Sequence, residues 1–233
     1  MSLSSPVSLG TGVPPINIMS LITAFKIDFD VTILDYDFSS LKKETRIHQD
    51  NLTFKSKEEW LKLRPYMRVL EKPEHHQIRD NLNKHVNDFM RNTYKFGNQE
   101  GTNEYVEQEF IITTSWLARL DEGQDRINKH RHTCAFWSGV LYYDDKYHWD
   151  ATPLEFESPI PWSSFDFNSP TFSRHLQIKP QTGLCILFPA DIVHYTDKIK
   201  KGEVRRSLAF NILPKGLTGV STSDSHYHPS WLI

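Results

Sequence analysis

Cysteine is scarce in this chain, which has only Cys134 and Cys185 among its 233 residues. Two thiols far apart in the sequence do not make a disulfide framework, so the pattern excludes a small disulfide-stapled scaffold. Each cysteine lies in an apolar, strand-like run, where cysteine usually serves as a small core residue. We therefore expect two reduced thiols in a cytoplasmic protein.

Long apolar runs and an excess of one charge sign are also missing. No stretch approaches the roughly 18–20 apolar residues of a membrane span, and the N-terminal segment lacks the basic start and apolar stretch of a secretory signal. The formal net charge of −2 gives no indication of nucleic-acid binding. The length suits one sizeable core. We expect a flexible lead-in over residues 1–14 and a single domain over residues 15–233.

The domain is predicted to be helical and mixed up to about residue 100. Ser39 or Ser40 is a candidate N-cap, and a second short helix is expected from Ser56. The clearest helix begins near Pro73 and ends at the "FGN" of residues 96–98. Its apolar face is expected, at steps of four, four and three, to consist of Ile78, Leu82, Val86 and Phe89.

From about residue 105 the sequence changes to short runs rich in β-branched and aromatic residues, separated by Pro, Gly, Asp and Asn. The runs are "EFIITTSWLARL", "WSGVLYYDD", "TPLEFES", "SRHLQIKP", "GLCILFP" and "VRRSLAFNIL". Short strands at fairly regular spacing predict an antiparallel sandwich or barrel over about residues 105–213, followed by a C-terminal tail.

Two of the eleven histidines, His130 and His132, lie one residue apart just before a predicted strand. In an extended chain, residues two apart point to the same side, so both imidazoles can reach one ion. The same spacing recurs in the tail at His226 and His228, so spacing alone is weak support. His194, in the loop after the strand "GLCILFP", offers a third imidazole. Because imidazole suits zinc, copper, iron and nickel, the ligand type does not choose the metal.

Arg205 begins a further predicted strand, eleven residues after His194. It shares a strand face with Ser207 and Asn211, as a polar pocket requires, whereas Arg206 shares its face with apolar residues. A guanidinium pairs with a carboxylate through charge-assisted, bidentate hydrogen bonds. Three imidazoles and this arginine therefore predict an ion site beside an anion-binding group.

These motifs, taken in series, resemble a family of 2-oxoglutarate–Fe(II) oxygenases. The resemblance rests on "HRHTCAFWSGVLYY", "GLCILFPADIVHYT" and "VRRSLAFN", and it runs from about Thr114 to Asn211. It implies a double-stranded β-helix, or jelly roll, with iron at one open end. Together with the predicted helices, this gives an α+β fold in which N-terminal helices pack on a jelly-roll core.

The resemblance also implies the roles of seven side chains. Fe(II) would be bound, and catalysis carried out, at His130, His132 and His194. The cosubstrate 2-oxoglutarate would be bound at its far carboxylate by Arg205 with support from Tyr142, in a pocket lined by Ser207 and Asn211.

One position departs from the wider superfamily, in which a carboxylate usually stands where this chain has His132. Two interpretations follow. Either three imidazoles bind iron, or only one of His130 and His132 binds and a water or a more distant carboxylate completes the shell. The available carboxylates are Asp144, Asp145, Asp150 and Glu155.

Two other functions compete with the oxygenase. One is a cupin-like metal dioxygenase or isomerase that does not use 2-oxoglutarate, and the other is a metal-free jelly-roll binding module. Cupins usually add a glutamate three or four residues after H-x-H, where this chain has Ala135 and Phe136. The substrate is predicted only as a small molecule or a protein side chain, and a homodimer stays open. Lid candidates for the cavity mouth are Tyr147, His148 and Trp149.

Overall fold

The computed structural model describes residues 29–44, 58, 62, 66–93, 108–122, 126–145, 147, 150–157 and 175–215. Within them, each of the six predicted β runs forms a strand. These strands are β2 (Phe110–Leu120), β3 (Trp137–Leu141), β4 (Leu154–Glu157), β5 (His175–Ile178), β6 (Leu184–Pro189) and β8 (Arg205–Pro214). Two further strands, which the sequence did not predict, are β1 (Asp30–Ile33) and β7 (His194–Tyr195).

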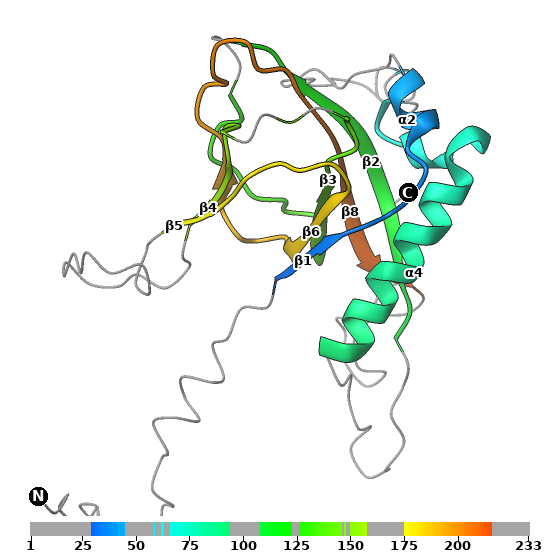
Figure 1. Cartoon of the computed structure of the whole chain (residues 1–233). Coiled ribbons are helices and arrows are strands. Elements are labelled where there is room, and N and C mark those ends of the chain that lie inside the picture. Colours follow the sequence, from blue (N-terminus) through cyan, green and yellow to red (C-terminus); the bar gives the residue numbers. More distant parts are fainter. Residues whose placement is uncertain are drawn as a thin grey trace, which may run out of the picture.

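The strands form two antiparallel sheets that face each other (Figure 1). The larger sheet has the order β1-β6-β3-β8-β2 and the smaller one β5-β4-β7. From β3 onward the chain crosses between the two sheets at every connection except that from β4 to β5, which pair within the smaller sheet. A bridge from His130 to His194 adds the segment before β3 to the smaller sheet. This connectivity is that of a double-stranded β-helix, so the predicted α+β fold with a jelly-roll core is confirmed.

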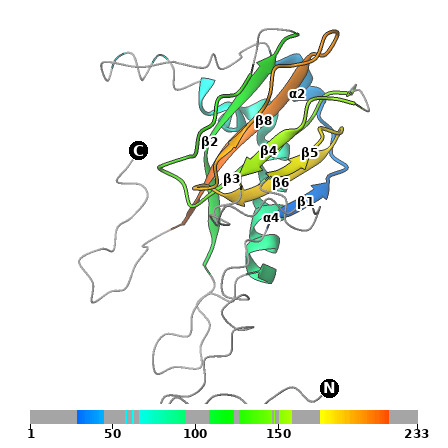
Figure 2. The same cartoon turned by 90° about the vertical axis from the view of Figure 1, so that its left-hand side faces the viewer.

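The helices cover the outer face of the larger sheet. They are α2 (Ser39–Lys43), the 3₁₀ turns η2 (Val69–Glu71) and η3 (Pro73–His75), and α4 (His76–Thr93). In Figure 2, β4 and β5 lie in front of the larger sheet and α4 lies behind it. None of the described helices is both long enough and apolar enough to cross a membrane.

The apolar face of α4 differs by one residue from the prediction. Its buried side chains are Ile78, Leu82, Val86 and Met90. Phe89 is only partly buried, and its ring meets the Trp137 ring edge-on at 5.2 Å between centroids. With 3.6 residues per turn, positions 89 and 90 both border the same stripe, so periodicity does not choose between them.

The predicted N-cap of the first helix was wrong. Helix α2 begins at Ser39 and its N-cap residue, Phe38, makes no side-chain cap. The carboxylate of Asp37 instead accepts hydrogen bonds from the Ser39 N–H (2.8 Å) and the Ser39 hydroxyl (3.1 Å). The helix expected from Ser56 lies outside the described residues apart from positions 58 and 62, as do the "FGN" end of α4 and the histidines of the tail.

Strand β6 separates two apolar cores. Leu184, Ile186 and Phe188 point to the core between the sheets, while Cys185 and Leu187 point to the core under the helices. Burial of each side chain of this size stabilises the fold by about 1.5–3 kcal/mol. This two-sided burial explains why "GLCILFP" is almost continuously apolar.

The two cysteines have different environments. Both are free thiols, and Cys185 is buried, as predicted. Cys134 is exposed, so its predicted place in the core was wrong. The chain turns at residues 133 and 134 before β3 begins, and this turn lifts Cys134 out of the strand.

A glycine allows β3 and β8 to approach closely beside the cavity. Gly139 lies opposite Phe210 in the strand register. A Cβ atom on Gly139 would lie 2.2 Å from the Phe210 ring, well inside contact distance. Only glycine fits there without repacking. The flanking Ser138 is thereby set directly opposite Asn211.

Candidate metal centre

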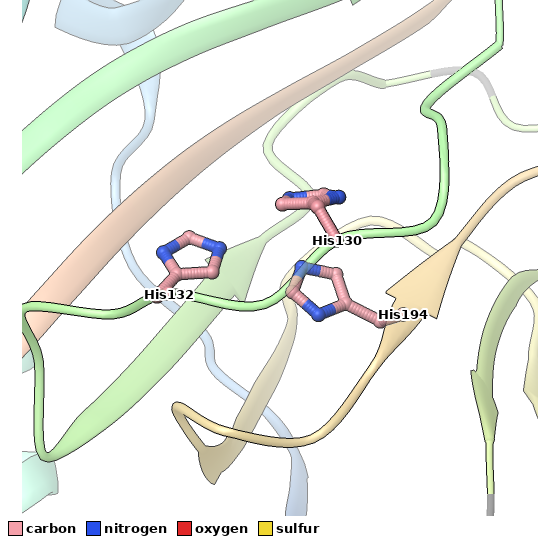
Figure 3. Close-up of side chains that lie close together, drawn as sticks. All are labelled: His130, His132 and His194. Carbon is pink, nitrogen blue, oxygen red and sulfur yellow. The ribbon is translucent and has the colours of Figure 1, made fainter.

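Three histidines, His130, His132 and His194, gather at one end of the jelly roll, and we call them the histidine triad. Main-chain hydrogen bonds join His130 N–H to His194 O (3.1 Å) and His194 N–H to His130 O (3.0 Å). The ring centroids lie 4.2 Å (130–194), 5.3 Å (130–132) and 5.1 Å (132–194) apart. One possible ligand atom from each residue lies within 4.8 Å of the others (Figure 3).

The hydrogen bonds of the triad determine which ring nitrogen is available to a metal. Nδ1 of His130 lies 2.8 Å from Asn128 O, Nδ1 of His194 lies 3.0 Å from Ile192 O, and Nδ1 of His132 lies 2.6 Å from the Asn211 side-chain oxygen. A carbonyl oxygen can only accept, so each Nδ1 carries the hydrogen. In the neutral ring, Nε2 then keeps its lone pair, and this arrangement is typical of metal-binding histidines.

Burial keeps two of these rings neutral. It lowers the pKa of His194 to about 3, with the neighbouring His130 as a smaller cause. It also lowers the pKa of His132. Because removing an imidazolium from water is costly, both rings are unprotonated near pH 7. A neutral imidazole is the form that binds a metal ion.

The triad opens into a cavity of about 410 Å³ between the sheets. The Trp116 ring stacks on His132, with 5.7 Å between centroids, and the Phe188 ring meets His194 edge-on at 4.8 Å. The other side chains at the wall include Met67, Ile127, Val140, Leu154, Arg205 and Ser207. No carboxylate is among the described residues that line the cavity, although two arginines are.

Arg205 is a buried cation at this cavity, only 2% exposed. Its Nη1 donates to Thr152 O (3.2 Å), its Nη2 contacts the Tyr142 hydroxyl, and its Nε finds no acceptor. No carboxylate of the described residues forms an ion pair with it. Burying an unpaired charge is expensive. An anion bound beside this guanidinium would offset that cost.

The other predicted pocket residues lie around Arg205 in different ways. Ser207 and Asn211 line the cavity from the same face of β8. Tyr142 is fully buried behind Arg205, and burial raises the pKa of its hydroxyl, which therefore stays protonated. Arg206 points to the opposite side, where its Nε lies 3.9 Å from a carboxylate oxygen of Asp144.

The four candidate carboxylates lie away from the triad. Asp145 pairs with Lys42, and Asp150 pairs with Lys200 at 2.7 Å. Glu155 is buried but accepts a hydrogen bond from the Tyr195 hydroxyl (2.9 Å). With Asp144 facing Arg206, the described residues bring three imidazoles together and offer no carboxylate beside them.

The sequence of the central segment matches a family model. Residues 114–211 match the family described as "Putative 2OG-Fe(II) oxygenase". The match covers less than half of the chain, and this segment is similar to the 2-oxoglutarate–Fe(II) oxygenases. The match runs from the middle of β2 to Asn211 on β8, and it includes the histidine triad and Arg205. Among curated proteins, no match to this chain is found.

Solved structures similar to this chain include three with low sequence identity. An oxidoreductase of the 2OG-Fe(II) oxygenase family from Burkholderia pseudomallei has 14% identity and a TM-score of 0.37, with 62% of this chain and 54% of that chain covered. A Pseudomonas putida prolyl-4-hydroxylase has 13% identity and a TM-score of 0.42, with coverages of 63% and 69%. HygX from Streptomyces hygroscopicus, with nickel and 2-oxoglutarate bound, has 13% identity and a TM-score of 0.44, with coverages of 86% and 87%. The chain thus spans about half the length of the Burkholderia protein.

The three predicted lid candidates fall into two groups. Tyr147 is held inside, since its hydroxyl contacts Arg206 O and its ring packs edge-on against Tyr142 at 5.6 Å. It is therefore a packing residue. His148 and Trp149 lie outside the described residues.

Sequence reasoning missed three residues of the site. Trp116 and Phe188 shield the triad, and Thr152 holds Arg205 through its carbonyl oxygen. Strand parity could have found Trp116, because it alternates with the buried Leu117 and lies on the same face as Ala118. A main-chain acceptor such as Thr152 O leaves no mark on the sequence.

Proposed function

We propose that this chain is a 2-oxoglutarate- and Fe(II)-dependent oxygenase whose histidine triad binds Fe(II) and whose Arg205 binds 2-oxoglutarate. One observation carries the proposal: a single cavity holds three imidazoles with free Nε2 atoms together with a buried guanidinium that lacks an acidic partner among the described residues. Imidazole is a suitable ligand for Fe(II). A guanidinium is suited to a carboxylate.

The donors around Arg205 fit the far carboxylate of the cosubstrate. The Arg205 Nε–H is buried and without an acceptor, and the protonated Tyr142 hydroxyl accepts from Arg205, which leaves its own hydrogen to donate. Ser207 adds a hydroxyl on the same face of β8. A carboxylate bound there would satisfy the orphaned donor and neutralise the buried charge.

When bound, Fe(II) with 2-oxoglutarate and dioxygen supplies the oxidative decarboxylation that yields succinate and oxidises a second substrate. The chain's own part is to orient and to shield. Trp116 and Phe188 exclude water from two sides of the triad. A site of neutral imidazoles leaves the full charge of the ion facing a dianionic cosubstrate, so the two are electrostatically complementary.

The competing functions account less well for Arg205. A metal dioxygenase that does not use 2-oxoglutarate has no need of a buried guanidinium that lacks an acidic partner among the described residues. A metal-free binding module has no need of three convergent Nε2 atoms. The cavity size suits a small molecule or a protein side chain as the oxidised substrate. The two free thiols suit the reducing cytoplasm, where we place the enzyme.

The test measures 2-oxoglutarate binding to the Ni(II)-loaded full-length protein by calorimetry, with succinate formation followed in the Fe(II) form. Arg205→Ala should keep the metal and bind 2-oxoglutarate about 10- to 150-fold more weakly, because a hydrogen bond to a charged group contributes roughly 1.5–3 kcal/mol. The matched control is Arg206→Ala, which removes the neighbouring arginine that faces Asp144 and should bind as the parent does. Equal affinities of the parent and Arg205→Ala would contradict the assignment.

A further inference from the structure

The three histidines of the triad are not held in the same way. His130 and His194 each give their Nδ1 hydrogen to a main-chain carbonyl two residues earlier in the chain, at Asn128 and Ile192. These acceptors are fixed by the backbone. His132 instead gives its Nδ1 hydrogen to the side-chain oxygen of Asn211, 2.6 Å away and on another strand. The orientation of His132 therefore depends on a side chain, whereas that of the other two does not.

A second residue holds the Asn211 amide in place. Ser138 is fully buried, and its hydroxyl donates to the same Asn211 oxygen at 2.9 Å. The two residues face each other in the register of β3 and β8. One amide oxygen thus accepts from the imidazole and from the hydroxyl, which is within the two-acceptor capacity of a carbonyl oxygen.

The direction of the amide matters for metal binding. If the amide were reversed, its NH₂ group would face Nδ1 of His132, and the ring hydrogen would have to move to Nε2. A hydrogen on Nε2 removes the lone pair that a metal needs. The oxygen of Asn211 therefore selects the ring tautomer, while the stacked Trp116 ring limits the tilt of His132.

We infer that Asn211 is a positioning residue of the metal centre: with Ser138, it fixes the tautomer and the orientation of His132 so that this imidazole is the third ligand. The inference rests on the proposed function and deepens it. It differs from the role that the sequence suggested, in which Asn211 lines the cosubstrate pocket. The partner of His132 is a neutral amide, so it adds no negative charge to the site.

The experiment titrates the metal-stripped full-length protein with Co(II) alone, without 2-oxoglutarate, by equilibrium dialysis and visible absorption. Asn211→Leu keeps the side-chain size and removes the acceptor. It should bind Co(II) about 10- to 100-fold more weakly, as loss of an outer-shell partner typically does, and should change the Co(II) absorption bands. Asn211→Asp restores an oxygen at the same place and should recover most of the affinity.

The matched control is Asn128→Leu, because the main-chain carbonyl of this exposed residue remains to hold His130. It should bind Co(II) like the parent. Ser138→Ala is the milder second variant, since it leaves the His132–Asn211 hydrogen bond in place, and it should weaken binding less than Asn211→Leu does. Circular dichroism and the unfolding midpoint show that each variant is folded.

Three outcomes separate the hypotheses. Parent-like Co(II) affinity and spectrum in folded Asn211→Leu would overturn the positioning role and favour a contact with the cosubstrate, because no cosubstrate is present. An equal loss in Asn128→Leu would also overturn it, since the effect would then not depend on the acceptor of His132. Failure of the parent itself to bind Co(II) would instead refute the metal centre and, with it, the proposed function.

Discussion

Two groups of side chains in the described part of the chain bring three ligand-type atoms within 4.8 Å of one another. One is the histidine triad. The other, which we call the acidic cluster, consists of Glu44, Glu74 and His75 and lies among the N-terminal helices. By distance alone the two groups are equivalent. Their surroundings differ in ways that separate a metal centre from a structural ion pair.

The acidic cluster already contains its cation. The Lys72 ammonium contacts a carboxylate oxygen of Glu44, and both side chains are largely buried, at 16% and 8% exposure. His75 Nε2 lies 3.5 Å from the same oxygen, while its Nδ1 lies 3.0 Å from the Ser40 hydroxyl. Glu74 is exposed. A metal ion would have to displace the lysine and draw in a solvated glutamate.

The triad has the opposite character. Its Nδ1 atoms are used by carbonyl oxygens, and its Nε2 atoms stay available. No ammonium or guanidinium in the described part of the chain makes a hydrogen bond to any of its three rings. The comparison teaches that short distances between donors do not define a metal site. A metal site is defined by lone pairs that outer hydrogen-bond partners orient and that no cation of the protein already occupies.

The largest expected effect is the difference in Ni(II) affinity between His130→Ala and His75→Ala. Removal of His130, a proposed ligand, should lower Ni(II) affinity by more than the roughly 10- to 100-fold that loss of an outer-shell partner costs. Since His130 is exposed, the metal-free variant should unfold within about 0.5 kcal/mol of the parent. His75→Ala should leave one Ni(II) per chain at unchanged affinity. Equilibrium dialysis decides, and a second Ni(II) that disappears with His75 would break the comparison.

Of the two regions, only the histidine triad could be predicted from the sequence. Strand parity placed His130 and His132 on one face, and the series of motifs connected them with His194 and Arg205. The acceptors of the three rings could not be predicted, because Asn211 follows His132 by 79 residues and the other two acceptors belong to the main chain. The acidic cluster was missed entirely, since its residues carry no common motif.

The fold shows the same division between local pattern and tertiary context. A composition rich in β-branched and aromatic residues, with turn residues between the runs, predicted β2, β6 and β8, whose side chains are buried on one or both faces. Strand β1 was not predicted, and its apolar residues Val31 and Ile33 are exposed. It exists through its pairing with β6, a contact that no local pattern reveals.

The intermediate effect tests the ion pair of the acidic cluster. Lys72→Met should leave Glu44 largely buried without its ammonium and reduce the free energy of unfolding by about 1–3 kcal/mol, less than a fully buried pair because Lys72 is partly exposed. Urea unfolding of the metal-free protein measures it. Adding Glu44→Gln to Lys72→Met should recover part of the loss. Ni(II) affinity should stay at the parent value in both variants, and a drop in it would mean that the two regions are coupled.

The smallest effect is the contribution of His75 to the pH dependence of stability. Burial lowers the pKa of His75 below its usual value near 6.5, although the carboxylate of Glu44 opposes the shift. The folded state therefore takes up a proton less readily than the unfolded chain, and the stabilisation present above pH 6.5 is lost as the pH falls from 6.5 through the lower pKa of the folded state. The slope from this one group cannot exceed about 1.4 kcal/mol per pH unit.

His75→Gln should therefore unfold with a shallower loss of stability between pH 7 and pH 5 than the parent. His132 and His194 have lowered pKa values too, and they contribute to the acid sensitivity of both proteins equally. The difference between parent and variant, measured by urea unfolding of the metal-free forms across this range, thus isolates His75. Parallel pH profiles would show that His75 titrates alike in the folded and unfolded states. Burial in the acidic cluster would then not keep His75 neutral, and the contrast with the triad would rest on the Lys72–Glu44 ion pair alone.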